Sequence, residues 1–178
     1  FKRDIDMKKI LLLATIFAFS IACGTNEDNR GYKVKIGDNC PNFSMELLDG
    51  TTITYESLLG KVSVIQFTAS WCGICRKEMP HLETQVWQKF KDKEFILLGV
   101  DLKESKEKTT TFIQEMQVTY PIALDTNGQV FEKFTLPKAG VTRNIVLDRN
   151  GKIIFLTRLF DPVEFNQMIK VIIKELEQ

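Results

Sequence analysis

Two cysteines three positions apart have the clearest chemistry in this sequence. Cys72 and Cys75 stand in the stretch Trp71-Cys72-Gly73-Ile74-Cys75, between an apolar run and an amphipathic one. A cysteine at a helix N-terminus loses its proton more easily, because unpaired N–H groups and the helix dipole favour an anion. We therefore expect Cys72 to attack as a thiolate. Cys75, one helical turn later, is expected to close a disulfide with it and release the product.

A zinc site and a purely structural disulfide are the alternatives for this pair. Zinc normally takes four ligands, but His81 is the only histidine of the chain and Cys40 would add only a third thiolate. A structural disulfide suits an exported protein, yet a C-x-x-C pair after a strand is typical of redox enzymes. We expect no metal and no cofactor besides the cysteine pair, and Cys40 to be a small buried hydrophobe.

Apolar runs alternate with helical patterns along the chain, which predicts an α/β fold with a central mixed β-sheet flanked by helices. Alternating residues around Asp49-Gly50 predict an N-terminal β-hairpin, and Asn150-Gly151 predicts a second hairpin near the C-terminus. Near-continuous apolar runs predict strands that are covered on both faces. These runs lie at 62–67, 95–100 and 143–147.

The predicted helices are marked by apolar spacing and by their end residues. From Cys75 to Phe90 apolar residues recur every three or four positions, and Pro80 is expected to kink this helix. Asp161-Pro162 should begin the last helix, with aspartate as N-cap and proline at the first helical position. Shorter elements are expected at 109–117 (helix), 120–124 (strand) and 129–134 (helix).

The N-terminus is expected to be a targeting segment outside the fold. Residues 1–22 hold a short basic stretch after Met7, the expected initiator, and then an apolar run of 12 residues at 10–21. Such a run is shorter than the roughly 20 residues that cross a bilayer. We therefore expect a signal peptide, with residues 1–6 lying upstream of it.

Cys23 follows the expected cleavage point directly. Ser20-Ile21-Ala22-Cys23 resembles a bacterial lipobox, so Cys23 is expected to carry a lipid, although Ser20 replaces the usual leucine. The alternative is an ordinary secretory cut that leaves Cys23 as a free thiol. Residues 23–35 are polar and predict a flexible tether, followed by one domain over 36–178. The expected location is extracytoplasmic, on a membrane and facing the periplasm.

The charge is balanced, with 24 basic and 23 acidic side chains and a formal net charge of +1. A nucleic-acid-binding protein usually shows a strong basic excess, so we expect no nucleic-acid partner. Membrane association is instead expected through the lipid on Cys23.

The stretch 67–80, FTASWCGICRKEMP, resembles the active site of the TlpA/ResA-like thioredoxin family within the redoxin (AhpC/TSA) superfamily. Gly37-Asp38, Asp49-Gly50 and Gly60-Lys61 are similar to the same group, as is the stretch from Val146 to Gly151. The resemblance implies a thioredoxin-like fold. It also implies the family's extra central strand and helix, with the strand at 120–125.

The resemblance also implies roles for single residues. Cys72 would be the attacking thiol and Cys75 the resolving one, with Trp71 shielding the pair. Glu78 would tune or relay protons; a solvated helix carboxylate is the alternative. Gln66 stands where cytoplasmic thioredoxins place a buried aspartate, and this shifts any proton relay towards Glu78.

The family's cis-proline falls here on Thr142, counting back six residues from Asp148. We therefore expect Thr142 to lie beside Cys72 and Cys75, and to bind substrate together with Val141 and Trp71. A cis bond before a non-proline residue costs about 3–4 kcal/mol, so a trans Val141–Thr142 bond is favoured. The alternative is a strand-entry residue with no role at the site. Ile74 replaces a proline that is frequent in the family.

The leading hypothesis is an extracytoplasmic thiol–disulfide oxidoreductase, a reductase or isomerase of protein disulfides. Its partners would be disulfide-bonded client proteins and a membrane or periplasmic thiol electron donor. A redoxin-type peroxidase is one alternative, but Ala69 and Ile65 stand where that signature has a hydroxyl residue and a proline. A non-catalytic binding module on the same fold is the other.

Overall fold

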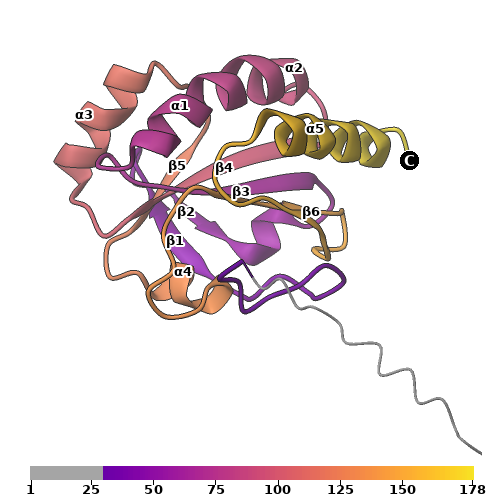
Figure 1. Cartoon of the computed structure of the whole chain (residues 1–178), viewed down its shortest axis with the longest axis horizontal. Helices are drawn as coiled ribbons and strands as arrows, with labels where there is room; N and C mark the ends of the chain where they lie inside the picture. Colours follow the sequence, from indigo (N-terminus) through magenta and orange to yellow (C-terminus); the bar gives the residue numbers. More distant parts are fainter. Residues whose placement is uncertain (1–29) are drawn as a thin grey trace, which may run out of the picture.

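The computed structural model describes residues 30–178, which form a mixed β-sheet with helices on both faces (Figure 1). The sheet has seven strands in the order β2-β1-β5-β4-β3-β6-β7. Its centre is parallel, because β3 pairs with β4 and β4 with β5 in that sense, whereas the outer pairs are antiparallel. The strands are β1 (Ser44–Leu47), β2 (Thr52–Thr54), β3 (Val62–Thr68), β4 (Phe95–Leu102), β5 (Ile122–Asp125), β6 (Arg143–Leu147) and β7 (Ile153–Leu156).

The helices divide between the two faces of the sheet. In Figure 1 the helices α1, α2, α3 and α5 lie along one face, and the short α4 lies on the other. Every residue of β3 and β6 is buried as a result, which confirms the expected covered strands. The helices are α1 (Gly73–Leu82), α2 (Gln88–Phe90), α3 (Lys106–Met116), α4 (Gln129–Phe134) and α5 (Pro162–Leu176), with a 3₁₀ turn η1 (Tyr55–Leu58) after β2.

The helix that starts at the cysteine pair is interrupted after its proline. A π-helical turn, η2 (Glu83–Trp87), joins α1 to α2. Proline lacks the N–H of a regular helical bond and clashes with the preceding turn, and such sites accommodate a wider turn. The Glu83 N–H accordingly donates to the carbonyls of both Met79 and Pro80. The helix thus departs from regular α geometry three residues after Pro80, in a π turn, whereas the sequence predicted a kink at the proline itself.

Both hairpins and the thioredoxin-like α/β architecture are confirmed. Register pairs Met45 with Ile53 in the first hairpin and Val146 with Phe155 in the second. The Asp161 carboxylate accepts from the N–H groups of Val163 and Glu164, as an N-cap should. The expected extra strand is β5, which joins the N-terminal hairpin to β4, with α3 before it.

The start of the domain lies earlier than the sequence predicted. Residues 30–35 were expected to belong to the tether, but Tyr32 is 5% exposed and its hydroxyl donates to the Thr157 carbonyl at 2.6 Å. Arg30 pairs with Glu164 at the start of α5, at 2.6 Å. The buried Tyr32 ring with its satisfied hydroxyl and the Arg30–Glu164 ion pair hold this segment against the rest of the domain. Residues 30–35, which were expected in the tether, therefore pack against the domain.

The expected signal segment, Cys23 and the remainder of the tether lie outside the described residues. Within 30–178, none of the helices combines the length and apolar character needed to cross a bilayer.

Candidate active site

The cysteine pair lies at the junction of β3 and α1, where the predicted helix N-terminus places it. Cys72 is the N-cap of α1, and its sulfur accepts from the Cys75 N–H at 3.2 Å. Both are free thiols, so the structure shows the reduced form. Cys72 is 9% exposed and Cys75 is fully buried. An incoming disulfide therefore meets Cys72 first.

The two thiols differ strongly in acidity. A hydrogen bond from the Cys75 thiol lowers the pKa of Cys72 well below its ordinary value, although burial opposes this. Hydrogen bonds from the Thr142 hydroxyl and from the N–H groups of Cys75 and Ile74 lower the pKa of Cys72 further. The same bond to Cys72, together with burial, raises the pKa of Cys75. Near neutral pH the pair is one thiolate, at Cys72, and one thiol, at Cys75.

Thr142 lies beside both sulfurs, as the count back from Asp148 predicted. Its Oγ1 is 3.0 Å from the Cys72 Sγ and 3.1 Å from the Cys75 Sγ. The hydroxyl can donate its one proton to the Cys72 thiolate, while the Cys75 thiol donates its own proton to the same sulfur. The expected position of Thr142 beside the cysteine pair is confirmed, and its role in substrate binding stays a prediction.

The backbone at Thr142 adopts an unusual conformation. No peptide bond among residues 30–178 is cis, so the bond after Val141 is trans, as expected. Thr142 has φ of 67°, a left-handed value that a β-branched residue rarely takes and that costs about 1–3 kcal/mol. Its N–H donates to the Phe67 carbonyl at 3.1 Å, and its carbonyl accepts from the Leu159 N–H at 2.9 Å. Two neighbouring segments thus hold the strained residue in place.

Val141 and Trp71, the other two residues expected to bind substrate, differ in exposure. Val141 is 4% exposed, and its carbonyl already accepts from the Arg158 guanidinium at 3.1 Å. Trp71 is 63% exposed, so most of its ring faces solvent next to Cys72. Trp71 is therefore available for contact with a docked molecule. Substrate binding by both residues and shielding by Trp71 remain predictions.

Glu78 is buried beneath the pair and is held by two amides. It is 1% exposed; Gln66 donates to its Oε2 at 3.3 Å and Asn144 to its Oε1 at 2.8 Å. Burial raises the pKa of Glu78 to about 7, against the lowering effect of Asn144 and Gln66. The alternative of a solvated helix carboxylate is therefore wrong. A carboxyl group that titrates near neutral pH can exchange a proton under working conditions.

Glu78, Gln66 and three residues that the sequence did not predict form a buried polar group, the Glu78 cluster. The three are Tyr120, Asn144 and Thr157. Tyr120 donates its hydroxyl to the Gln66 Oε1 at 2.8 Å, and Asn144 donates to the Thr157 Oγ1 at 2.9 Å. The Asn144 Oδ1 is buried without a hydrogen-bond partner among the described residues. The available signal was a polar residue inside an apolar run, which Gln66 and Asn144 share.

Cys40 is the third cysteine among the described residues, and it is a free thiol. Cys40 is 5% exposed, and burial raises its pKa to about 12, so this thiol stays protonated. Within residues 30–178 no group of three histidine, cysteine, aspartate or glutamate side chains could hold a metal ion.

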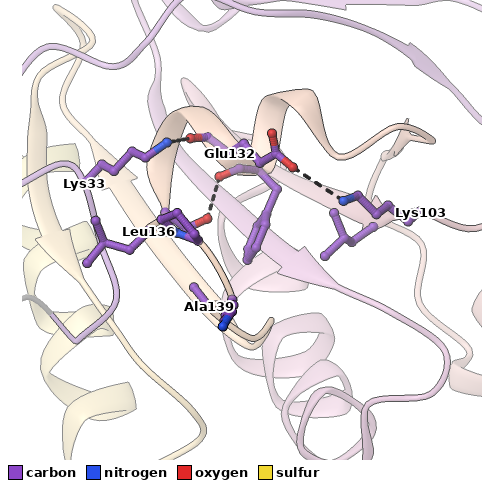
Figure 2. Close-up of a pocket in the computed structure, with 10 residues that line it drawn as sticks. Lys33, Lys103, Glu132, Leu136 and Ala139 are labelled. Carbon is purple, nitrogen blue, oxygen red and sulfur yellow. Dashed lines mark hydrogen bonds and ion pairs between the residues drawn. The ribbon is translucent and has the colours of Figure 1, made fainter.

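A separate pocket of about 400 Å³ lies between α4, the end of β4 and the loop that leads towards Thr142 (Figure 2). Its rim includes Lys33, which donates to the Glu132 carbonyl at 2.6 Å, and Lys103, which pairs with the Glu132 carboxylate at 3.5 Å. None of its ten lining residues belongs to the dithiol site or to the Glu78 cluster. This pocket is therefore separate from the cysteine pair and from Glu78.

A thiolate at a helix start, a buried partner thiol and a mixed sheet of this topology define a thioredoxin-fold thiol–disulfide oxidoreductase. The AhpC/TSA family matches residues 36–156, and the chain belongs to that family. It is 30% identical over 153 residues to the thiol-disulfide oxidoreductase ResA of Bacillus subtilis, covering 86% of this chain and 84% of that one.

Solved structures agree with this assignment. A protein of Bacteroides thetaiotaomicron described as a protein disulfide isomerase has a TM-score of 0.81 and 47% identity, over 83% of this chain and 94% of that one. A protein of Chlorobium tepidum described as the thiol:disulfide interchange protein DsbE has a TM-score of 0.70 and 25% identity, over 80% of this chain and 99% of that one. The chain is thus a TlpA/ResA-like enzyme of thiol–disulfide exchange.

Proposed function

We propose that this enzyme reduces or isomerises protein disulfides outside the cytoplasm, with Cys72 as nucleophile and Cys75 as resolving thiol. The asymmetry of the pair supports the assignment: the accessible thiol has the lowered pKa and the buried thiol the raised one. A scaffold that only bound partners would need neither property. The Thr142 hydroxyl supports it further, because it contacts both reacting sulfurs.

The reaction transfers two electrons in two steps. In the first step the Cys72 thiolate attacks one sulfur of a client disulfide, so that a Cys72–client disulfide forms and the client S–S bond breaks. The second client sulfur leaves as a thiolate and takes a proton from solvent. Cys75 then loses its proton and attacks the Cys72 sulfur. The Cys72–Cys75 disulfide forms and the client is released with both sulfurs reduced. A thiol electron donor restores the enzyme by the reverse exchange.

Side chains around the pair assist each step. In the first step the Thr142 hydroxyl stabilises the thiolate on Cys72 by hydrogen bonding. In the second, we expect Glu78 to receive the Cys75 proton. The two residues are three positions apart on α1 and therefore lie on one face of the helix, which supports this role. A pKa near 7 allows Glu78 to take that proton and return it in the reverse direction.

The extracytoplasmic location rests on the N-terminal pattern. A basic stretch, a short apolar run and Cys23 form the expected signal of a bacterial lipoprotein. A lipid on Cys23 would attach the enzyme to a membrane, where it would meet clients and a thiol donor. Intact-mass measurement of protein extracted from membranes tests the lipid, and a soluble product with a free Cys23 thiol contradicts it.

Trapping of the mixed disulfide tests the proposed function. In Cys75→Ser the second step cannot occur, so Cys72 should remain linked to its client and be recovered in thiol-reversible, higher-mass complexes. Cys72→Ser should trap nothing, and Cys40→Ser, which changes only the inert buried thiol, should behave as the wild type. Failure of the Cys75→Ser variant to form such complexes, while its Cys72 remains reactive towards alkylating agents, refutes the proposal.

A further inference from the structure

Glu104 is a buried carboxylate for which the reaction described above has no use. It lies in the loop between β4 and α3 and is 6% exposed. Its Oε2 accepts from the Ser70 backbone N–H, and its Oε1 accepts from the Ser70 hydroxyl at 2.7 Å. The third polar group of Ser70, its carbonyl, accepts from the Arg76 guanidinium at 2.8 Å. All polar groups of Ser70 are thereby bound.

Ser70 lies inside the turn that delivers the attacking cysteine. The Cys72 N–H donates to the Ala69 carbonyl at 3.1 Å, and the Cys72 carbonyl accepts the first helical bond from Arg76, also at 3.1 Å. A displacement of Ser70 would therefore move Cys72. Thr142 belongs to a separate segment just before β6, and its backbone is bound to Phe67 and Leu159 rather than to Ser70. The contact of 3.0 Å between Cys72 and Thr142 depends on both supports.

The Glu104 carboxylate is held in its charged form. Burial raises the pKa of Glu104, but the Lys108 ammonium and the two Ser70 donors outweigh burial, and its pKa is below the ordinary value. Hydrogen bonds to an ionised acceptor are roughly twice as strong as neutral ones. The two hydrogen bonds from Ser70 to the Glu104 carboxylate are therefore of the stronger, charge-assisted kind.

A second buried acid, Asp101, lies near Glu104. Asp101 is 1% exposed; its Oδ1 accepts from the Thr109 hydroxyl at 3.0 Å, and its Oδ2 is buried without a partner among the described residues. Burial, followed by the charge of Glu104, raises the pKa of Asp101 to about 7. A neutral Asp101 leaves one negative charge, on Glu104, in this buried cluster.

We infer that Glu104 is a positioning residue for Cys72, acting through Ser70 from the β4–α3 loop. The inference rests on the proposed role of Cys72 as nucleophile. By holding the turn of residues 69–72, Glu104 keeps the Cys72 sulfur within reach of the Thr142 hydroxyl and the Cys75 N–H. Loss of Glu104 should therefore raise the pKa of Cys72, although Glu104 acts through Ser70 rather than on the sulfur itself.

The test compares Glu104→Ala and Glu104→Gln in the reduced protein. We expect the pH titration of Cys72 alkylation, with its midpoint near 5 in the wild type, to shift upward by about one unit in Glu104→Ala, which slows alkylation about tenfold on the acid side of the midpoint. Glutamine keeps an oxygen for the Ser70 N–H and an amide for its hydroxyl, so Glu104→Gln should stay within about threefold of the wild type. Glu107→Ala, at an exposed position of α3, is the matched control.

Alkylation does not depend on any client, so the outcomes separate the two proposals. If Glu104→Ala folds and its Cys72 titrates as in the wild type, the positioning role is wrong, whatever the exchange activity. If Glu104→Ala fails to fold, Ser70→Ala supplies the result: it removes the hydroxyl bond alone and should slow alkylation about threefold. An unchanged rate in Ser70→Ala then overturns the inference. Absence of disulfide exchange in the wild type would count against the proposed function instead.

Discussion

Replacing Thr142 by valine removes the hydroxyl between the two sulfurs and keeps almost the same shape. Both residues are β-branched, so the left-handed backbone, with φ of 67°, is equally unfavourable for each. The bonds from the Thr142 N–H to Phe67 and from Leu159 to the Thr142 carbonyl involve only backbone groups and should persist. The change therefore isolates the hydroxyl contacts of 3.0 and 3.1 Å.

The expected effect on Cys72 follows from the strength of that bond. A hydrogen bond to a charged group contributes about 1.5–3 kcal/mol. One pKa unit corresponds to about 1.36 kcal/mol, so full loss would raise the pKa of Cys72 by about 1–2 units. The hydroxyl is shared with Cys75, which favours the lower end, and we expect a rise of about 1 unit.

The assay is the pH dependence of Cys72 alkylation in the reduced protein, followed by the mass of the product. Thr111→Val on α3, whose hydroxyl donates to the Glu107 carbonyl far from the sulfurs in sequence, is the control and should leave the curve unchanged. The reasoning fails if Thr142→Val folds and the pKa of its Cys72 lies within about 0.3 units of the wild-type value, a difference of only about 0.4 kcal/mol. The hydroxyl would then not stabilise the thiolate.

Three further predictions test other parts of the structure. The pKa of Glu78 is raised to about 7, so the wild type should lose stability as pH rises from about 4.5 to 7. In urea unfolding, the free energy of unfolding of Glu78→Gln should therefore gain up to about 3 kcal/mol relative to that of the wild type between pH 4 and pH 8. A difference between the two proteins that does not change with pH would contradict the raised pKa. Tyr32→Ala should cost about 3 kcal/mol or more in urea unfolding, because it removes a buried aromatic; a loss below about 1 kcal/mol would show that residues 30–35 are not part of the packed domain. Peroxide should be consumed negligibly by the reduced enzyme, because Ala69 offers no hydroxyl; rapid consumption coupled to Cys72 oxidation would show a peroxidase instead.

The order of the elements was predictable because each has a strong local signal. The three apolar runs became β3, β4 and β6, and Asp161-Pro162 marked the start of α5 within one residue. The position of Thr142 was also predictable, but from the family resemblance and a count along one strand. Antiparallel pairing of β6 with β3 then carries Thr142 back to the end of the sheet where Cys72 follows β3.

The buried polar clusters were not predictable, since their members meet only through strand register. Asn144 reaches Glu78 because β6 pairs with β3 so that Asn144 lies opposite Gln66. Asp101 lies opposite Thr68 on β3, and Glu104 reaches Ser70 across a loop. A sequence pattern records which side chains are polar, but not which of them the register brings together.

The early start of the domain was missed for a related reason. From Tyr32 to Ile36 apolar residues alternate with lysines, but this period of two covers only five residues and follows a polar stretch. The partner of Tyr32, the Thr157 carbonyl, comes from the far end of the chain. The contact between Tyr32 and Thr157 leaves no local signal, because the two residues lie far apart in the chain.

Stoichiometric exchange with a disulfide-bonded peptide tests the central claim most directly. Reduced wild-type enzyme, mixed with an equal amount of the peptide and quenched with acid, should be recovered about 2 Da lighter, with Cys72 and Cys75 joined and the peptide carrying two thiols, because two electrons pass in the exchange. An enzyme whose mass and thiols are unchanged, although its Cys72 reacts readily with alkylating agents, would contradict the assignment of this pair as a thiol–disulfide exchange centre.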